Sequence, residues 1–153
     1  MFKENNDTVL VKKAGKVAVI TLNRPTRYNA ITEELKWGLL HAFTDIQQDD
    51  TIKAIVLTGN GKGFCAGADM ADLQQSGNAD PQAIRDNLIM VYGNICRMIM
   101  RSDKPVIAAI NGPVAGAGLG FALACDLRIM AEHANMRYAF TVSYTHLTLP
   151  TKA

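Results

Sequence analysis

Two short stretches rich in glycine and alanine decide the fold: GFCAGAD at residues 63–69 and NGPVAGAG at residues 111–118. Each follows an apolar run that is typical of a buried strand, AIVL at residues 54–57 and VIAAI at residues 106–110. Each also opens a segment that is predicted to be a helix. Small residues let a ligand approach the peptide backbone closely. If the two loops lie side by side, two backbone N–H groups could face one oxygen atom and form an oxyanion hole.

The rest of the pattern predicts an α/β fold with parallel strands, because strands alternate with helices along the chain. Two β-rich runs at residues 8–11 and 17–20 predict a hairpin. Thr32 is a suitable N-cap for the first helix, whose buried face is expected to carry Ile31, Leu35, Leu39, Phe43 and Ile46. Further strands are expected at residues 53–58, 106–110 and 127–131, and further helices at residues 81–102 and from the second loop to Ala124.

Composition and charge narrow the class of protein. The chain has 153 residues, 48% of them hydrophobic and 20% charged, as in one soluble globular domain. A net charge of +2 without any block of like charges gives no support for a nucleic-acid partner. No apolar run reaches the length of a membrane span and no signal peptide is evident, so a cytoplasmic location is expected. Cys65, Cys96 and Cys125 share no metal-ligand spacing, so no metal site is expected.

Four stretches in order resemble the crotonase (enoyl-CoA hydratase/isomerase) superfamily. They are ITLNRP at residues 20–25 with Asn29-Ala30, residues 64–69, KPVIA at residues 104–108, and residues 111–126. The resemblance implies a crotonase-like spiral of ββα units, with residues 1–141 forming an incomplete acyl-CoA-binding domain. Residues 142–153 do not resemble the family and are expected to be a non-native tail. Full-length members are expected to form homotrimers or hexamers, an assembly not expected of this chain without the usual trimerising helices.

The resemblance also implies the chemistry. Crotonases polarise the carbonyl of an acyl-CoA thioester so that an enolate can form, and here the two N–H donors would belong to Ala66 and Ala117. The positive end of the helix that begins near Gly116 would add to them. Coenzyme A is part of the substrate, so no separate cofactor is expected. Arg27 is expected to contact its phosphates, and the remaining candidate binding residues are Cys65, Gly67, Ala68, Asp69, Met70, Gly116 and Gly118.

Proton transfer is the part that the resemblance leaves open. Hydratases of the family use two glutamates, and the matching positions here hold Gly120 and Phe140. The pattern is closer to the double-bond isomerases, whose single carboxylate would follow residue 141. Negligible turnover of enoyl-CoA is therefore expected of this chain, and a non-catalytic CoA-thioester binder or an unstable fragment are the alternatives.

Residues that might replace the missing carboxylate have other expected roles. Asp69 is expected to cap a helix, and Asp126 and Glu132 to stabilise turns or to face solvent. Tyr138 could reach a pocket but is expected in the core, and Cys65 is expected to be a small apolar filler rather than a nucleophile.

Overall fold

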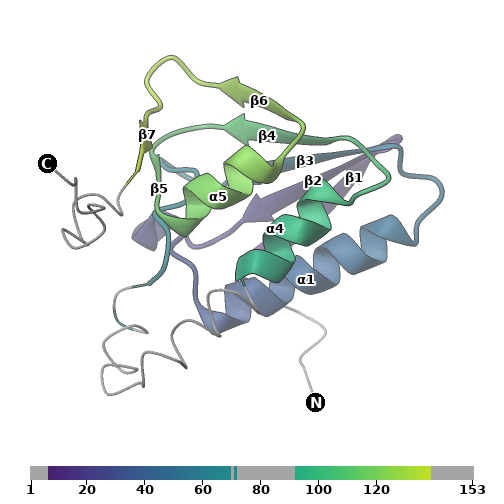
Figure 1. Ribbon diagram of the computed structural model, residues 1–153, viewed down its shortest axis with the longest axis horizontal. Coiled ribbons are helices and arrows are strands. Elements are labelled where there is room, and N and C mark those ends of the chain that lie inside the picture. The colour runs from purple at the N-terminus through teal and green to yellow at the C-terminus, as the bar shows by residue number, and fades with distance from the viewer. Residues whose placement is uncertain (1–6, 70, 72–91, 139–153) are drawn as a thin grey trace, which may run out of the picture.

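A five-stranded sheet lies at the centre of the molecule, with helices over one of its faces (Figure 1). The computed structural model describes residues 7–69, 71 and 92–138. In spatial order the strands are β1 (Val9–Ala14), β2 (Val17–Leu22), β3 (Ala54–Gly59), β4 (Val106–Ile110) and β6 (Leu127–Met130). β1 and β2 form the predicted antiparallel hairpin, and the pairs β2–β3, β3–β4 and β4–β6 are parallel. The predicted α/β fold with parallel strands is confirmed.

The three central strands bury every second residue. The burial pattern alternates along β2, β3 and β4, as expected of strands whose two faces have different surroundings. Ile20, Ile55 and Ala108 are among the buried members, and all join the same hydrophobic core. In β6 all four residues are exposed.

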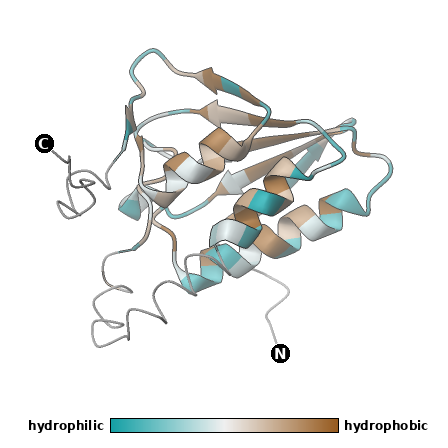
Figure 2. Cartoon of the chain, viewed as in Figure 1, coloured by the Kyte–Doolittle hydropathy of each residue, from teal (hydrophilic) through white to brown (hydrophobic). Residues whose placement is uncertain are grey.

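In the described part of the chain, three helices pack against the sheet and complete the hydrophobic core. They are α1 (Glu33–Gln47), α4 (Gly93–Met100) and α5 (Ala117–Ala124), and α4 contacts both of the others. Thr32 caps α1 as predicted, because its Oγ1 accepts a hydrogen bond of 3.3 Å from the N–H of Leu35. The predicted buried face of α1 is at most 1% exposed throughout. Figure 2 shows that hydrophilic and hydrophobic residues alternate around α1, whereas α5 is mostly apolar.

Several short elements were not predicted. A single 3₁₀ turn, η1 (Pro25–Arg27), precedes α1, and two-residue strands β5 (Val114–Ala115) and β7 (Met136–Arg137) pair in parallel. Elements this short carry no periodicity that a sequence pattern could reveal. The first part of the helix predicted at residues 81–102 lies outside the described residues. Among the described helices, none is both long enough and apolar enough to cross a membrane.

Two polar side chains anchor the start of β4. The ammonium group of Lys104 donates to the carbonyl oxygens of Ile46, Gln47 and Asp49, and so caps the carboxyl end of α1. Asp126 Oδ2 accepts a 2.7 Å hydrogen bond from the N–H of Val106. Asp126 and Glu132 are both exposed, as expected, and the hydrogen bond of Asp126 joins two strands and does not stabilise a turn.

Replacing Lys104 by methionine should destabilise the fold, because the last carbonyls of α1 lose a charged donor. We expect the free energy of unfolding to fall by about 1.5–3 kcal/mol in guanidinium titrations. Lys62→Met, which makes the same change at an exposed position, should have little effect. Equal unfolding midpoints for the two variants would contradict the capping role.

Candidate functional site

The two small-residue loops lie side by side, as the sequence predicts. The N–H of Phe64 donates to the carbonyl oxygen of Pro113 at 3.1 Å, and the N–H of Ala115 donates to that of Cys65 at 3.0 Å. Glycine makes this approach possible at Gly67, where φ is +93° and a Cβ atom would lie 3.3 Å from the nitrogen of Ala117. The contact between the loops is therefore made by main chain against main chain.

The side-chain amide of Asn29 holds the first loop in place. This side chain is fully buried, and its Nδ2 lies 3.0, 2.9 and 3.1 Å from the carbonyl oxygens of Asn60, Gly63 and Phe64. Its Oδ1 accepts a hydrogen bond of 2.8 Å from the N–H of Arg24. Asn29 has a φ of +55°, a left-handed conformation that asparagine tolerates better than most residues. One amide thus connects the turn after β2 to the whole of the first loop.

A second asparagine contacts the same loop from the other strand. Asn111 Oδ1 accepts a hydrogen bond of 3.2 Å from the N–H of Gly59, and its Nδ2 donates to the carbonyl oxygen of Gly61 at 3.0 Å. Both asparagines stand inside the motifs quoted above, but nothing in those motifs indicates a role for their side chains. Because a Cβ atom at Gly59 would lie 2.4 Å from the carbonyl oxygen of Gly63, this turn also requires glycine.

The assignment of Ala66 as an oxyanion donor is corrected by the structure. The N–H of Ala66 already donates to the carbonyl oxygen of Tyr28 at 2.9 Å, so it is not available to a ligand. Tyr28 itself has a φ of +50°, unusual for a bulky residue. The Ala66 N–H therefore fixes the first loop to the turn after η1.

The N–H of Ala68, two residues after Ala66, is not used by the fold in the way that the N–H of Ala66 is. The parallel bridge between Ile31 and Ala68 uses the carbonyl of Gly67 and the N–H of Asp69. In such a bridge the N–H of the middle residue, here Ala68 between Gly67 and Asp69, faces away from the segment that contains Ile31. Within the described residues, neither the N–H of Ala68 nor that of Ala117, the first residue of α5, has a hydrogen-bond acceptor. Both N–H groups are therefore available to a ligand.

Two of the predicted binding residues serve packing instead. Cys65 is fully buried, its Sγ donates to the carbonyl oxygen of Asn29 at 3.2 Å, and burial raises the pKa of its thiol to about 12. A Cβ atom on Gly118 would lie 2.6 Å from the Sγ of Cys65, so Gly118 allows α5 to pack against the first loop. Cys65 is thus the apolar filler that was expected, and its side chain does not face a ligand.

The carboxylate of Asp69 is also engaged within the fold. Its Oδ2 accepts a hydrogen bond of 2.9 Å from Nη1 of Arg24, and its Oδ1 accepts one of 3.0 Å from the N–H of Ala71. The hydrogen bond from Arg24 lowers the pKa of Asp69. An ionised carboxylate held in this way suits the expected capping role better than contact with substrate. Arg27 is exposed at the end of η1, and Met70 lies outside the described residues.

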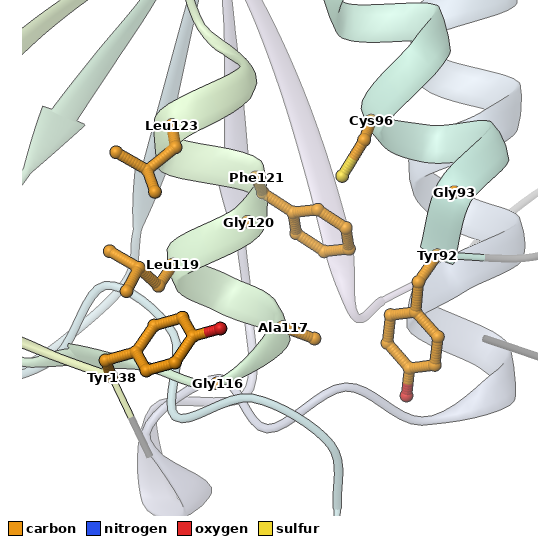
Figure 3. Close-up of a pocket in the computed structure, with 10 residues that line it drawn as sticks. All are labelled: Tyr92, Gly93, Cys96, Gly116, Ala117, Leu119, Gly120, Phe121, Leu123 and Tyr138. Carbon is orange, nitrogen blue, oxygen red and sulfur yellow. The ribbon is translucent and has the colours of Figure 1, made fainter. Parts of the chain in front are cut away.

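Two pockets flank the loop pair. One, of about 230 Å³, runs along α5 between Tyr138 and α4 (Figure 3). The other, of about 330 Å³, is bordered by Tyr28, Ala66 and Arg137. The expectation that Tyr138 is part of the core was wrong, since it is 63% exposed and lines the first pocket. In the part of the chain that the structure describes, no aspartate or glutamate lines either pocket.

Changing Asn29 to aspartate should disrupt the first loop, because a carboxylate oxygen would face three carbonyl oxygens. Aspartate also tolerates a left-handed backbone, so the variant changes mainly the donor. We expect the free energy of unfolding to fall by about 3 kcal/mol, measured by chemical denaturation. Asn60→Asp makes the same change at an exposed position, where the amide donates to the side chain of Asn23, and should cost about 0.5 kcal/mol or less. Similar losses for both variants would show that Asn29 does not hold the loop.

Comparisons with known proteins agree with this geometry. The family model described as enoyl-CoA hydratase/isomerase matches residues 12–147. The 1,2-epoxyphenylacetyl-CoA isomerase of Escherichia coli is 40% identical over 82% of this chain and 48% of its own length. The short-chain-enoyl-CoA hydratase of Clostridium acetobutylicum is 35% identical over 84% of this chain and 48% of its own length.

A solved structure of an enoyl-CoA hydratase shows that the similarity extends to the fold. The crystal structure of enoyl-CoA hydratase from Bacillus anthracis superposes with a TM-score of 0.80 at 32% identity, covering 90% of this chain and 52% of the other. The chain spans about half the length of the curated relatives it matches. The loops, the sheet order and these matches together show that the chain belongs to the enoyl-CoA hydratase/isomerase family, with the crotonase fold.

Proposed function

We propose that this protein binds an acyl-CoA thioester and polarises its carbonyl group with the backbone N–H groups of Ala68 and Ala117. The observation that carries the proposal is the pair of available donors on two adjacent loops, of which Ala117 also lines an apolar pocket. Relatives named as a 1,2-epoxyphenylacetyl-CoA isomerase and a short-chain-enoyl-CoA hydratase support acyl-CoA thioesters as the class of substrate. Coenzyme A enters as part of the substrate.

The donors are suited to stabilise an enolate because they belong to the rigid main chain. The first loop is held by Asn29 and by the hydrogen bond from Ala66 to Tyr28, so Ala68 needs no rearrangement when charge develops. Ala117 begins α5, whose positive N-terminal end favours a negative oxygen. Preorganised donors of this kind each contribute about 2.7–4 kcal/mol to lowering a barrier.

The proton-transferring carboxylate of the family has no counterpart in the lining of the described pockets. Gly120 cannot transfer a proton, and neither pocket is lined by a carboxylate within the described residues. We therefore propose that the residues described here supply binding and carbonyl polarisation, with negligible hydration or isomerisation of enoyl-CoA by the chain of 153 residues. The same observation favours a non-catalytic acyl-CoA binder as the second candidate function.

The variant Ala117→Pro should remove one donor while keeping the helix, because proline is well tolerated at the first position of a helix. The infrared carbonyl band of bound, ¹³C-labelled butyryl-CoA should shift to lower frequency in the wild type and less in this variant. Ala117→Gly keeps the N–H and should retain the full shift. The same shift in all three proteins at saturation would mean that the Ala117 N–H does not bind the carbonyl.

Arg27 remains a prediction for contact with the phosphates of coenzyme A. Arg27→Ala should weaken butyryl-CoA binding by about tenfold in calorimetric titrations, because a charge-assisted contact is lost. Butyryl-pantetheine, which has no nucleotide phosphates, should bind the variant and the wild type equally. Arg101→Ala, which removes an exposed arginine after α4, is the matched control. Unchanged butyryl-CoA affinity in Arg27→Ala would count against the assignment.

A further inference from the structure

The guanidinium group of Arg24 joins the two segments that form the bridge between Ile31 and Ala68. Its Nη1 donates to the carbonyl oxygen of Ala30 and, at 2.9 Å, to Oδ2 of Asp69. Ala30 comes directly before Ile31 in one segment. Asp69 comes directly after Ala68 in the other, so one nitrogen atom is hydrogen-bonded on both sides of the bridge.

The bridge sets the direction of the N–H of Ala68. The N–H of Ile31 donates at 2.8 Å to the carbonyl oxygen of Gly67, and this carbonyl belongs to the same peptide group as the N–H of Ala68. Because a trans peptide group is planar, its C=O and N–H point in opposite directions. Whatever keeps the carbonyl of Gly67 on Ile31 therefore keeps the N–H of Ala68 turned away from Ile31.

The bridge lacks the support that a longer strand would give it. It lies outside the named strands, so no neighbouring pairs of a ladder fix its register. Its second hydrogen bond runs from the N–H of Asp69 to the carbonyl oxygen of Ile31, at 3.0 Å. Hydrogen bonds with a charged partner are about twice as strong as those between neutral groups. The guanidinium group thus adds two strong contacts beside a pair of ordinary ones.

The ion pair between Arg24 and Asp69 is shielded from water. The side chain of Asp69 is 9% exposed and that of Arg24 is 21% exposed. A carboxylate in such a place needs a charged partner, because its removal from water is costly. Its other oxygen, Oδ1, accepts the hydrogen bond from the N–H of Ala71. Both carboxylate oxygens are therefore held, and the backbone of Asp69 is held with them.

The backbone of Arg24 is fixed to the first loop as well. Its N–H donates to Oδ1 of Asn29 at 2.8 Å, and its carbonyl oxygen accepts from the N–H groups of Arg27 and Asn29, both at 3.0 Å. Asn29 is the residue whose amide holds the first loop. The guanidinium group thus extends from a fixed point to the bridge.

We propose that Arg24 is a positioning residue, whose guanidinium group keeps the N–H of Ala68 turned toward the thioester carbonyl. It acts through the backbone of Ala30 and the carboxylate of Asp69, without contact to the carbonyl itself. This role is distinct from that of Arg27, whose predicted contact is with phosphates. The inference rests on the proposed function, since it assumes that Ala68 is one of the two oxyanion donors.

The test measures the infrared carbonyl band of ¹³C-labelled butyryl-CoA bound at saturation to the 153-residue chain. In Arg24→Met we expect the shift to lower frequency to fall to about half of the wild-type value, because one of two donors is no longer aligned. Arg24→Lys keeps a charged donor and should recover part of the shift. Lys13→Met breaks the ion pair with Asp49, which joins β1 to the turn after α1, and should keep the full shift.

A folding defect is separated from lost positioning by a second variant and a second measurement. Arg24→Met leaves the buried carboxylate of Asp69 without its charged partner, whereas Arg24→Met/Asp69→Asn removes both charges and should show the same reduced shift. Amide hydrogen exchange at Ile31 and Asp69 should be at least about tenfold faster in both variants, relative to that at Leu57 in the centre of β3. The ratio to Leu57 corrects for any change in global stability.

The outcomes distinguish the inference from the proposed function. A full shift in Arg24→Met, or bridge amides that exchange no faster relative to Leu57 than in the wild type, would overturn the inference and leave the proposed function intact. If the difference disappears with butyryl-pantetheine, which has no nucleotide phosphates, Arg24 acts on the nucleotide and the inference is likewise wrong. If butyryl-CoA bound to the wild type shows no shift, the proposed function itself is wrong.

Discussion

The buried amide of Asn29 is the interaction on which the arrangement of the site depends. The backbone carbonyls of Asn60, Gly63 and Phe64, the last two in the first loop, converge on its Nδ2, and its Oδ1 accepts a hydrogen bond from the N–H of Arg24. Without this amide the buried carbonyl of Phe64 would lose its donor, at a cost comparable to that of a lost hydrogen bond. The loop is therefore shaped by the turn that follows β2, and the position of Ala68 relative to Ala117 follows from it.

Most of the fold could be predicted from the sequence because its elements are long enough to show a period. The hairpin, the capped helix α1 and the parallel strands β3 and β4 were all predicted. The strands bury alternate residues and α1 buries one face, which confirms that the period of the hydrophobic residues identified them. β5, β7 and η1 have only two or three residues each, and they form because neighbouring segments supply the hydrogen bonds. No pattern within such short segments could have indicated them.

The sequence predicted which loops form the site, but it did not predict which backbone N–H groups of those loops are available. Glycine and alanine at residues 63–69 and 111–118 indicated that main-chain groups act there, and the loops do meet. Which N–H remains available is decided by the register of the bridge between Ile31 and Ala68, and register is a property of the assembled chain. For the same reason the sequence could not distinguish Gly118, which packing requires, from Gly120, which it does not.

A peptide N–H has no ionisation in the physiological range, unlike a histidine, lysine or carboxylic acid that binds an anion. The polarising power that we propose for the loop pair is therefore constant wherever the fold is intact, and protons in solution do not compete for it. Substitutions of the neighbouring side chains leave the two donors chemically unchanged as long as the backbone keeps its path. Such a site can be combined with different proton-transferring groups over evolutionary time, because carbonyl polarisation and acid–base chemistry are carried by separate parts of the molecule.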